Sequence, residues 1–537
     1  MIIDIRDARR ALSATSPVNL GYMTSIYDDA PPWKEDDEDD AKGLVFTSDM
    51  EKLKRYNAED CVRTDRVCGG VLAEPQWGTP RVQRLYKLHT GLSRIAADMY
   101  QVGLPVDKKN RRELAKQLEA MYDEREKKLL DLVAVPGFRC TPNDMRALLF
   151  KRHATAKVSR FNLPDPMDPA QWVKKKMQTI AVDQSALLLL IADPDCPKEI
   201  INIVDAYWQA EGAWKARSTY VVSKKVEEAI GDDGRLRAGW NSCGTDTGRF
   251  SCSAPNLMNL SEKKDEDGGA LVGDLPNMRQ MYWAGPGCVM IGADFSQLEL
   301  RVMAAVSGDK VLEAALQSGD VYTADAIDVF GLPPHLRKCE CKDTPGREKG
   351  NAWCLENCIK GAPRKAAKIV HLAFQYAATA PTIYKQALEQ DRKVQFRLIK
   401  QIHQALLRRY CGTVDYWHAE HARVRKTGYS ETRILHRRRV YPREPPPTET
   451  ANYPVQGTAA DVANLAMLRI YNKFRRYVPR SKLVIQLHDA FYAIAREKDA
   501  KVTKEILIEE MEKPVVIDGK QWTFPVEAKV GTHWSQL

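Results

Sequence analysis

Two aspartates at the ends of apolar runs are the residues best suited to metal-dependent chemistry. Asp294 follows the run CVMIGA, and Asp489 follows LVIQLH. Phosphoryl transfer is favoured by two divalent ions about 3.5–4 Å apart that neutralise the attacking and leaving oxygens, and Mg²⁺ needs few carboxylates. The pair therefore predicts a site for two Mg²⁺ ions, although an isolated aspartate at a strand end is more commonly a turn residue.

A second candidate site consists of four residues spaced four apart, namely Arg364, Lys368, Leu372 and Tyr376. In one helix this spacing places all four on the same face. Two cations on one face suit the binding of a triphosphate. An ordinary solvated basic face is the alternative, and the spacing alone does not choose between them.

The hydrophobic pattern indicates which elements position these residues. A short apolar strand ends at Asp294, and a helical pattern containing Glu299 follows it. Asp489 lies between two apolar runs, as in a β-hairpin. The long block between the aspartates is mainly helical, as are residues 51–125. This mixture predicts an α+β fold.

Length and composition limit the class of protein. With 537 residues the chain should form two to four subdomains. The absence of an apolar run of eighteen residues and of a secretory signal predicts a cytoplasmic protein without a membrane partner. Clustered basic residues within a net charge of +10 favour a polyanionic partner, although such runs are often solvated faces.

Ordered sequence blocks resemble those of family A DNA polymerases, the bacterial polymerase I type. The resemblance spans about residues 80–537. The second and the last block resemble motifs A and C of that family, and the fourth resembles its fingers helix. The blocks are TDTGRFSCSAPNLMNL at 245–260, DFSQLELR at 294–301, GDVYTADAIDVFG at 319–331, RKAAKIVHLAFQYAA at 364–378, ANYPVQGTAAD at 451–461 and QLHDA at 486–490.

The resemblance implies a right-hand architecture of palm, fingers and thumb. The expected parts are an exonuclease-domain remnant at 1–75, the thumb and connecting helices at 76–235, the palm at 236–304 and 431–537, and the fingers at 305–430.

The N-terminal remnant is inferred from one motif. YNAEDCVRT, with Tyr56 and Asp60, resembles the last motif of the family's 3′–5′ exonuclease domain. Exonuclease cleavage with two metal ions needs further carboxylates. They are not recognisable in residues 1–50. Proofreading is therefore expected to be absent from this chain, and a separate exonuclease subunit or other replisome proteins are candidate partners.

The resemblance also implies roles for single residues at the catalytic centre. Asp294, Asp489 and the backbone carbonyl of Phe295 would hold two Mg²⁺ ions. Arg364 and Lys368 would bind the triphosphate of the incoming dNTP, and Lys368 would also assist the leaving group.

Other residues would bind the sugar, the base and the DNA. Glu299 would exclude a 2′-hydroxyl and so select deoxynucleotides. Gln297, Tyr322, Leu372 and Tyr376 would complete the dNTP site. The residues expected at the primer-template are Arg249, Asn452 and Gln456, which would contact the minor groove, and His488, which would lie at the primer terminus.

Two positions depart from the family pattern. Leu372 stands where polymerase I relatives usually carry Phe or Tyr, and Ala490 stands where many have Glu. The change at 490 removes one carboxylate near the expected metals. The leucine resembles that of some phage polymerases, so a phage or prophage source is expected.

A cysteine-rich insertion at 335–362 holds four of the twelve cysteines. Cys339, Cys341, Cys354 and Cys358 could supply the tetrahedral ligands of a structural Zn²⁺. Their spacings of one and three residues are less typical of zinc than two and two, so reduced free thiols remain the alternative.

Two other functions remain open at this stage. A single-subunit RNA polymerase shares both aspartates and the fingers lysine, but Glu299 and the block at 245–260 favour DNA synthesis. A catalytically inactive DNA-binding scaffold is suggested by the short exonuclease segment, whereas retention of Asp294, Asp489 and Lys368 argues against it.

Overall fold

The computed structural model describes most of the chain. The described parts are mainly helical and contain one sheet of more than two strands. In these parts no helix combines the length and the apolar character that crossing a membrane requires. The described residues are 5–12, 20–28, 50–155, 157–166, 179–193, 195–242, 244–260, 275–317, 319–330, 362–390 and 394–537.

A four-stranded antiparallel sheet carries both aspartates. Its strand order is β12-β5-β9-β8. Side chains alternate between the two faces of a strand. Ile291, Ala293 and Phe295 of β5 therefore join the main core, whereas Asp294 lies on the opposite face. The strands are β5 (Cys288–Phe295), β8 (Lys482–Leu487), β9 (Ala490–Arg496) and β12 (Val526–Gly531).

Three helices cover the face of this sheet that carries Ile291, Ala293 and Phe295. α5 (Pro80–Val102) packs on β8, α19 (Pro447–Tyr477) also contacts β8, and α20 (Ala500–Met511) packs on β5 and β9. The buried residues of α5 recur three and four apart, as an amphipathic helix requires. Thr79 caps its first turn, where a proline follows and loses no helical hydrogen bond. The sheet is thereby fixed on a rigid helical support.

The expected thumb is an elongated helical body with its own core. Its two longest helices lie side by side, and Asp107 caps the first by accepting hydrogen bonds from two backbone amides. The helices are α6 (Lys108–Val133), α7 (Pro142–Leu149), α8 (Gln184–Ile191), α9 (Lys198–Lys215), a π-helical continuation (Ala216–Val221) and α10 (Lys224–Ala229).

The expected fingers form a second helical body after β5. α11 connects the sheet to this body. A buried polar cluster joins α13 and α15 to the junction of α17 and α18. Asp325 of α13 accepts hydrogen bonds from His371 of α15 and from Tyr410, which lies between α17 and α18. α11 (Leu298–Ser307) lies mostly within the expected palm. The helices of the expected fingers are α12 (Lys310–Gln317), α13 (Val321–Phe330), α15 (Ala362–Phe374), α16 (Ala380–Gln390), α17 (Phe396–Arg409) and α18 (Cys411–Thr427).

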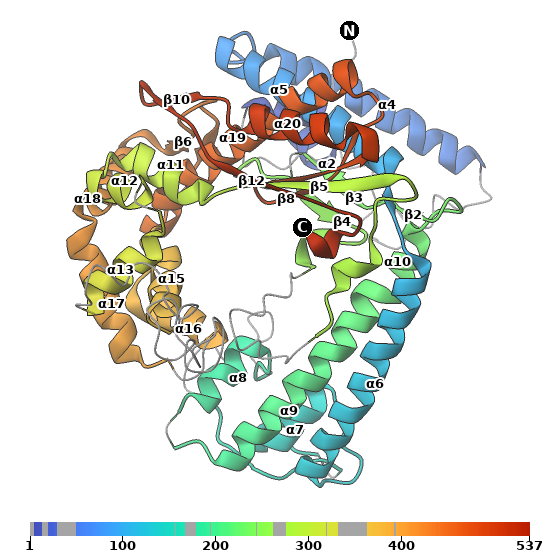
Figure 1. Ribbon diagram of the computed structural model, residues 1–537, viewed down its shortest axis with the longest axis vertical. Coiled ribbons are helices and arrows are strands. Elements are labelled where there is room, and N and C mark those ends of the chain that lie inside the picture. The colour runs from blue at the N-terminus through green and yellow to red at the C-terminus, as the bar shows by residue number, and fades with distance from the viewer. Residues whose placement is uncertain are drawn as a thin grey trace.

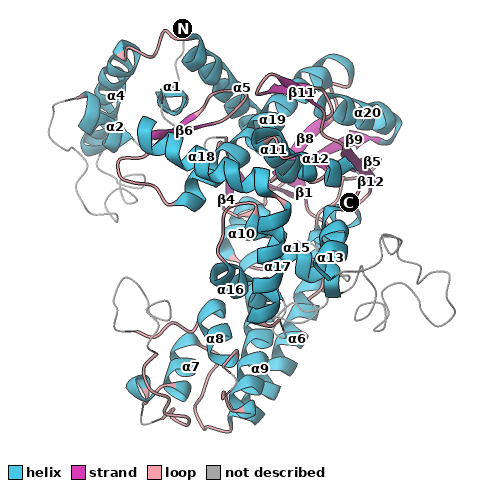
Figure 2. Cartoon of the chain, turned by 90° about the vertical axis from the view of Figure 1, so that its left-hand side faces the viewer, coloured by secondary structure: helices cyan, strands magenta, loops and turns pink. Residues whose placement is uncertain are grey.

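The fingers and the thumb touch below the sheet. In Figure 1 they lie on opposite sides, and α8 of the thumb packs against α16 of the fingers, as Figure 2 also shows. Leu388 of α16 is 2% exposed and belongs to the apolar core of the thumb. The two bodies and the sheet therefore form a ring in this conformation.

The N-terminal helices pack beside α5. Met23 forms a small core with three apolar residues, and Arg63 pairs with Asp28 at 2.7 Å. The helices are α1 (Ile5–Leu12), α2 (Leu20–Tyr27) and α4 (Met50–Ala73).

Four two-stranded ribbons complete the described strands. The ribbon β3–β4 leads into and out of the segment that contains Arg249. The pairs are β1 (Leu104–Pro105) with β2 (Arg235–Leu236), β3 (Gly239–Asn241) with β4 (Ser251–Ser253), β6 (Tyr429–Glu431) with β7 (Arg438–Val440), and β10 (Val515–Ile517) with β11 (Lys520–Trp522).

Candidate active site

The sheet register brings the two aspartates together. Asp294 lies directly opposite Ala490 of β9, and Asp489 is the residue before Ala490 in the turn from β8. Neighbouring strands are about 4.8 Å apart. Both carboxylates therefore lie at the same edge of the sheet, where Asp294 is exposed and Asp489 is half-buried.

The donors at this edge fit Mg²⁺. Burial raises the pKa of Asp489, so its negative charge is disfavoured until a cation compensates it. The carboxylates and the carbonyl of Phe295 are hard oxygen donors of the kind that Mg²⁺ prefers. Within the described residues, no three His, Cys, Asp or Glu side chains are grouped closely enough to hold a metal. Mg²⁺ is commonly held by one or two carboxylates, with phosphate oxygens and water completing its shell.

Two residues beside the aspartates have left-handed backbones. Gln297, at the start of α11, and His488, in the turn between β8 and β9, both have φ of 54°. This conformation is uncommon for residues other than glycine and is found at functional sites. The side-chain amide of Gln486 donates a hydrogen bond of 2.5 Å to the carbonyl oxygen of His488. The turn is thus held in an unfavourable conformation by its neighbours.

Arg249 and Glu299 form an ion pair next to Asp489. Each side chain is 25% exposed. Burial and the charge of Asp489 raise the pKa of Glu299 to about 7. Burial lowers the pKa of Arg249. The two charges therefore compensate each other at a place where neither is well solvated.

The fingers contribute a second group of predicted residues. Nε of Arg364 donates to Asp320 at 2.6 Å, and Nη2 donates to the other carboxylate oxygen at 3.3 Å. The same guanidinium lies over the ring of Tyr322, 5.6 Å from its centre. Burial, and to a smaller extent the charges of Asp320 and Glu299, raise the pKa of Tyr322. Tyr322 is thus close enough to Glu299 of α11 for the charge of that carboxylate to affect its pKa.

Three polar atoms of predicted residues are buried and have no hydrogen-bond partner within the described chain. They are the hydroxyl of Tyr376, Oε1 of Gln297 and Oδ1 of Asn452. Buried polar atoms in proteins are nearly always hydrogen-bonded. Within the described chain these three groups therefore have unused hydrogen-bonding capacity that a polar substrate could take up.

The family model of DNA polymerase family A matches residues 108–343 and 353–536. The chain belongs to DNA polymerase family A. The matched segments contain the predicted metal, dNTP and DNA residues. The family expected from the ordered blocks is thereby confirmed, whereas a phage source remains a prediction.

This family A chain is similar to several bacterial DNA polymerases I. It is 28% identical to that of Chloroflexus aurantiacus over 337 residues, which cover 60% of this chain and 31% of the relative. It is 25% identical to that of Bacillus subtilis over 442 residues, covering 80% and 44%. For Pseudomonas aeruginosa the values are 24% over 555 residues, covering 100% and 53%. The chain spans about a third to a half of these relatives.

A solved structure confirms the fold of the family A chain. The POL domain of Pol1 from M. smegmatis, in complex with DNA primer-template and dNTP, matches with a TM-score of 0.72 and 20% identity. The match covers 99% of this chain and 82% of that one. At this identity the likeness establishes the α+β right-hand polymerase fold, as the resemblance predicted.

The fingers helix differs from its expected extent. α15 ends at Phe374, so Tyr376 lies in the turn after it. Ala377 adopts a left-handed backbone with φ of 56°, which a continuing helix does not allow. Arg364 and Lys368 are half-buried, whereas Leu372 is 38% exposed. The expectation that all four residues lie on one helix was therefore wrong for Tyr376.

Several predicted residues lie outside what the structure describes. Cys339, Cys341, Cys354 and Cys358 fall in the segment 331–361, so the zinc hypothesis stays a prediction. The side chain of Tyr56 is also outside the described set, whereas Asp60 is half-buried on α4. The remaining DNA candidates Asn452 and Gln456 are half-buried and four residues apart on α19.

Asp320 is a residue of the site that sequence reasoning missed. It binds the guanidinium of Arg364 with both carboxylate oxygens. Its place in the block at 319–331, directly before α13, was a signal that could have drawn attention to it. Its partner lies in a distant segment, so the pairing itself was not visible in the sequence.

Proposed function

We propose that this chain is a DNA-templated DNA polymerase that extends a primer 3′-hydroxyl with dNTPs and releases pyrophosphate. The observation that carries the proposal is the meeting of Asp294 and Asp489 at one sheet edge. Membership of family A supports the same reaction. The proposed partners are primer-template DNA and dNTPs, and the proposed compartment is the cytoplasm.

The metal-binding residues would be Asp294, Asp489 and the carbonyl of Phe295. Two Mg²⁺ ions bound there would supply charge neutralisation at the attacking and leaving oxygens. The raised pKa of Asp489 supports this assignment, because a carboxylate that is costly to ionise gains most from a nearby cation. Ala490 contributes no carboxylate, so these two aspartates would carry the site.

The fingers would bind the triphosphate. Arg364 offers a planar guanidinium that suits phosphate oxygens, and Asp320 fixes the orientation of that group through Nε and Nη2. Lys368 would bind phosphate oxygens. It would also protonate the departing pyrophosphate or stabilise its negative charge. Leu372 would pack against the sugar. Tyr376 would lie near the template base.

The sheet side would select the sugar and test the primer-template. Glu299 would block the 2′ position of a ribonucleotide, with Gln297 and Tyr322 completing the pocket. Minor-groove acceptors are present in all correct base pairs, so contacts there test geometry without reading sequence. We assign these contacts to Arg249, Asn452 and Gln456, and the primer terminus to His488.

Primer extension tests the proposal directly. Wild type should extend a primed template with dNTPs and much more slowly with rNTPs. Asp489→Asn should lose extension while still binding primer-template, and Asp123→Asn, an exposed carboxylate on the thumb, should behave as wild type. Equal inactivity of wild type and Asp489→Asn would favour the scaffold alternative. Faster extension with rNTPs would favour an RNA polymerase.

We also propose that this chain lacks proofreading. The sequence supports this, because residues 1–50 hold no recognisable carboxylate motif of an exonuclease. A primer with a mismatched 3′ end should remain uncleaved when dNTPs are withheld. Rapid removal of the mismatched nucleotide by the chain alone would overturn the proposal, whereas removal only after addition of a second protein would identify an exonuclease partner.

A further inference from the structure

The turn at 245–249 is held by contacts within itself. The backbone amide of Gly248 donates to the carbonyl of Thr245 at 3.1 Å. The hydroxyl of Thr245 donates to the carbonyl of Arg249 at 3.0 Å. These bonds close the turn but do not anchor it to the rest of the protein.

Asn464 anchors the turn from α19. Its side-chain amide donates a 2.9 Å hydrogen bond to the carbonyl of Gly248, the residue directly before Arg249. Asn464 is 2% exposed, so water does not compete for this bond. The position of the turn is therefore coupled to the helix that also carries Asn452 and Gln456.

The guanidinium of Arg437 lies against the same glycine. Gly248 has φ of +84°, and a Cβ built on it would lie 2.5 Å from Cζ of Arg437. The guanidinium is fixed in turn by Asp461 at 3.2 Å and by a 3.1 Å contact with Nε2 of His89. Arg437 and Asp461 are 2% and 0% exposed. The turn thus rests directly on a buried ion pair.

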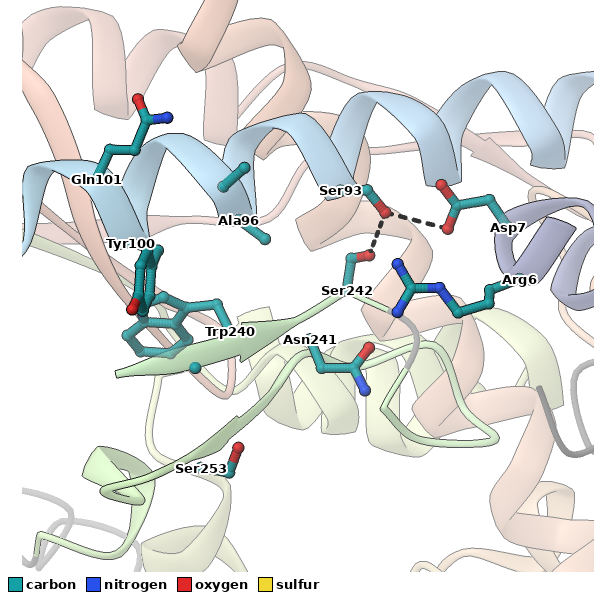
Figure 3. Close-up of a pocket in the computed structure, with 12 residues that line it drawn as sticks. Arg6, Asp7, Ser93, Ala96, Tyr100, Gln101, Trp240, Asn241, Ser242 and Ser253 are labelled. Carbon is teal, nitrogen blue, oxygen red and sulfur yellow. Dashed lines mark hydrogen bonds between the residues drawn. The ribbon is translucent and has the colours of Figure 1, made fainter. Parts of the chain in front are cut away.

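Ser93 of α5 links the end of the preceding strand to α1. The hydroxyl of Ser93 donates to Asp7 of α1 at 3.0 Å and lies 2.9 Å from the hydroxyl of Ser242, which follows β3. Figure 3 shows these three side chains at one end of a cavity of about 580 Å³. Arg10 of α1 lies 4.0 Å from Asp246 of the turn. These contacts connect the end of β3 and the turn to α1 and α5.

We propose that Asn464 and Arg437 are positioning residues that hold Arg249 where its guanidinium reaches the minor groove of the primer-terminal pair. The inference rests on the proposed function, because the contact between Arg249 and DNA is itself part of that proposal. Asn464 and Arg437 touch neither the substrate nor the reacting atoms in this scheme. They act on Gly248 itself, Asn464 through a hydrogen bond to its carbonyl and Arg437 by packing its guanidinium against it.

A minor-groove probe tests this role. A primer ending in 3-deazaadenine lacks the N3 acceptor of adenine but pairs normally. In single-turnover extension, wild type should use the normal primer at least about 10-fold faster than the modified one, since a hydrogen bond to a charged group is lost. Arg249→Ala should extend both primers equally. Asn464→Leu should likewise bring the ratio of the two extension rates, normal primer over modified primer, towards one.

The matched control removes a buried hydrogen bond elsewhere in the sheet region. Thr503→Val deletes a hydroxyl that lies 2.7 Å from that of Ser481, on a residue that is fully buried. It should lower thermal stability while keeping the wild-type ratio between the two primers. Asn464→Ser, which is smaller than leucine, serves as a second variant if Asn464→Leu does not fold.

The outcomes separate the two proposals. If Arg249→Ala keeps the wild-type ratio, the minor-groove role of Arg249 is wrong. If Arg249→Ala extends both primers at the same rate but both Asn464 variants keep the wild-type ratio of the two rates, the positioning role of Asn464 is wrong. The inference is supported if the ratio of the two extension rates falls towards one in Arg249→Ala and in the Asn464 variants but keeps its wild-type value in Thr503→Val.

Discussion

The guanidinium of Arg249 pairs with the carboxylate of Glu299, although the two residues come from different segments of the chain. Arg249 precedes β4, and Glu299 lies in the first turn of α11. Both are close enough to Asp489 for its charge to influence their pKa values. A residue proposed to select the sugar and a residue proposed to contact the primer are therefore electrostatically coupled.

Replacing Glu299 should weaken sugar discrimination. In Glu299→Ala the space beside the 2′ position is opened, so the preference for dNTPs over rNTPs should fall by about 10-fold or more. The measurement is kcat/KM for one dNTP and the matching rNTP. Glu505→Ala, an exposed carboxylate on α20, provides the control. An unchanged preference in Glu299→Ala would remove Glu299 from the sugar site.

Asp320 should affect substrate binding more than the chemical step. Asp320→Ala frees Arg364 to adopt many rotamers, because the two hydrogen bonds that orient its guanidinium are lost. The KM for dNTPs should rise about 10-fold with little change in kcat. Steady-state extension at varied dNTP concentration measures this. A lower KM would mean that Asp320 competes with the triphosphate.

The contact between thumb and fingers should slow the release of DNA. Leu388→Ala removes an apolar side chain that is 2% exposed and joins α16 to the thumb core. The change should lower the free energy of unfolding by about 2–5 kcal/mol and, because it weakens the contact between the two bodies, increase the dissociation rate of primer-template. Extension in the presence of a DNA trap measures it. Leu130→Ala, on the thumb surface at 40% exposure, is the control. Equal product lengths would argue against a role for the ring.

Stability should fall on mild acidification because of His89. Burial, together with the charges of Arg437 and Arg10, holds the pKa of His89 well below its usual value. The folded protein keeps His89 neutral, whereas the unfolded chain takes up a proton near pH 6.5. His89 therefore costs stability progressively as pH drops below about 6.5, by at most about 1.4 kcal/mol per pH unit.

Thermal unfolding of His89→Gln at pH 7.5 and 5.5 checks this. The midpoint should fall less on acidification in the variant than in wild type. The exposed His418 gives the comparison, since His418→Gln should keep the wild-type pH dependence. If the midpoint of His89→Gln falls as much between pH 7.5 and 5.5 as that of wild type, the prediction is wrong.

Local patterns in the sequence determined much of this protein. The run of apolar residues before each aspartate predicted the two strands, and the second run after Asp489 predicted the hairpin formed by β8 and β9. Ordered motifs predicted family A and its fold. These features are visible in sequence because alternation, helical spacing and motif order depend on residues close together in the chain.

The tertiary structure decided how distant segments meet. The register that sets Asp294 opposite Ala490, the pairing of Arg249 with Glu299 and of Arg364 with Asp320, and the bond from Asn464 to Gly248 all join separate segments. Such contacts depend on how helices and strands pack around shared cores. The spacing of residues along the sequence does not predict that packing. Even the end of α15 before Tyr376 depended on a left-handed residue, Ala377, whose type gives no turn signal.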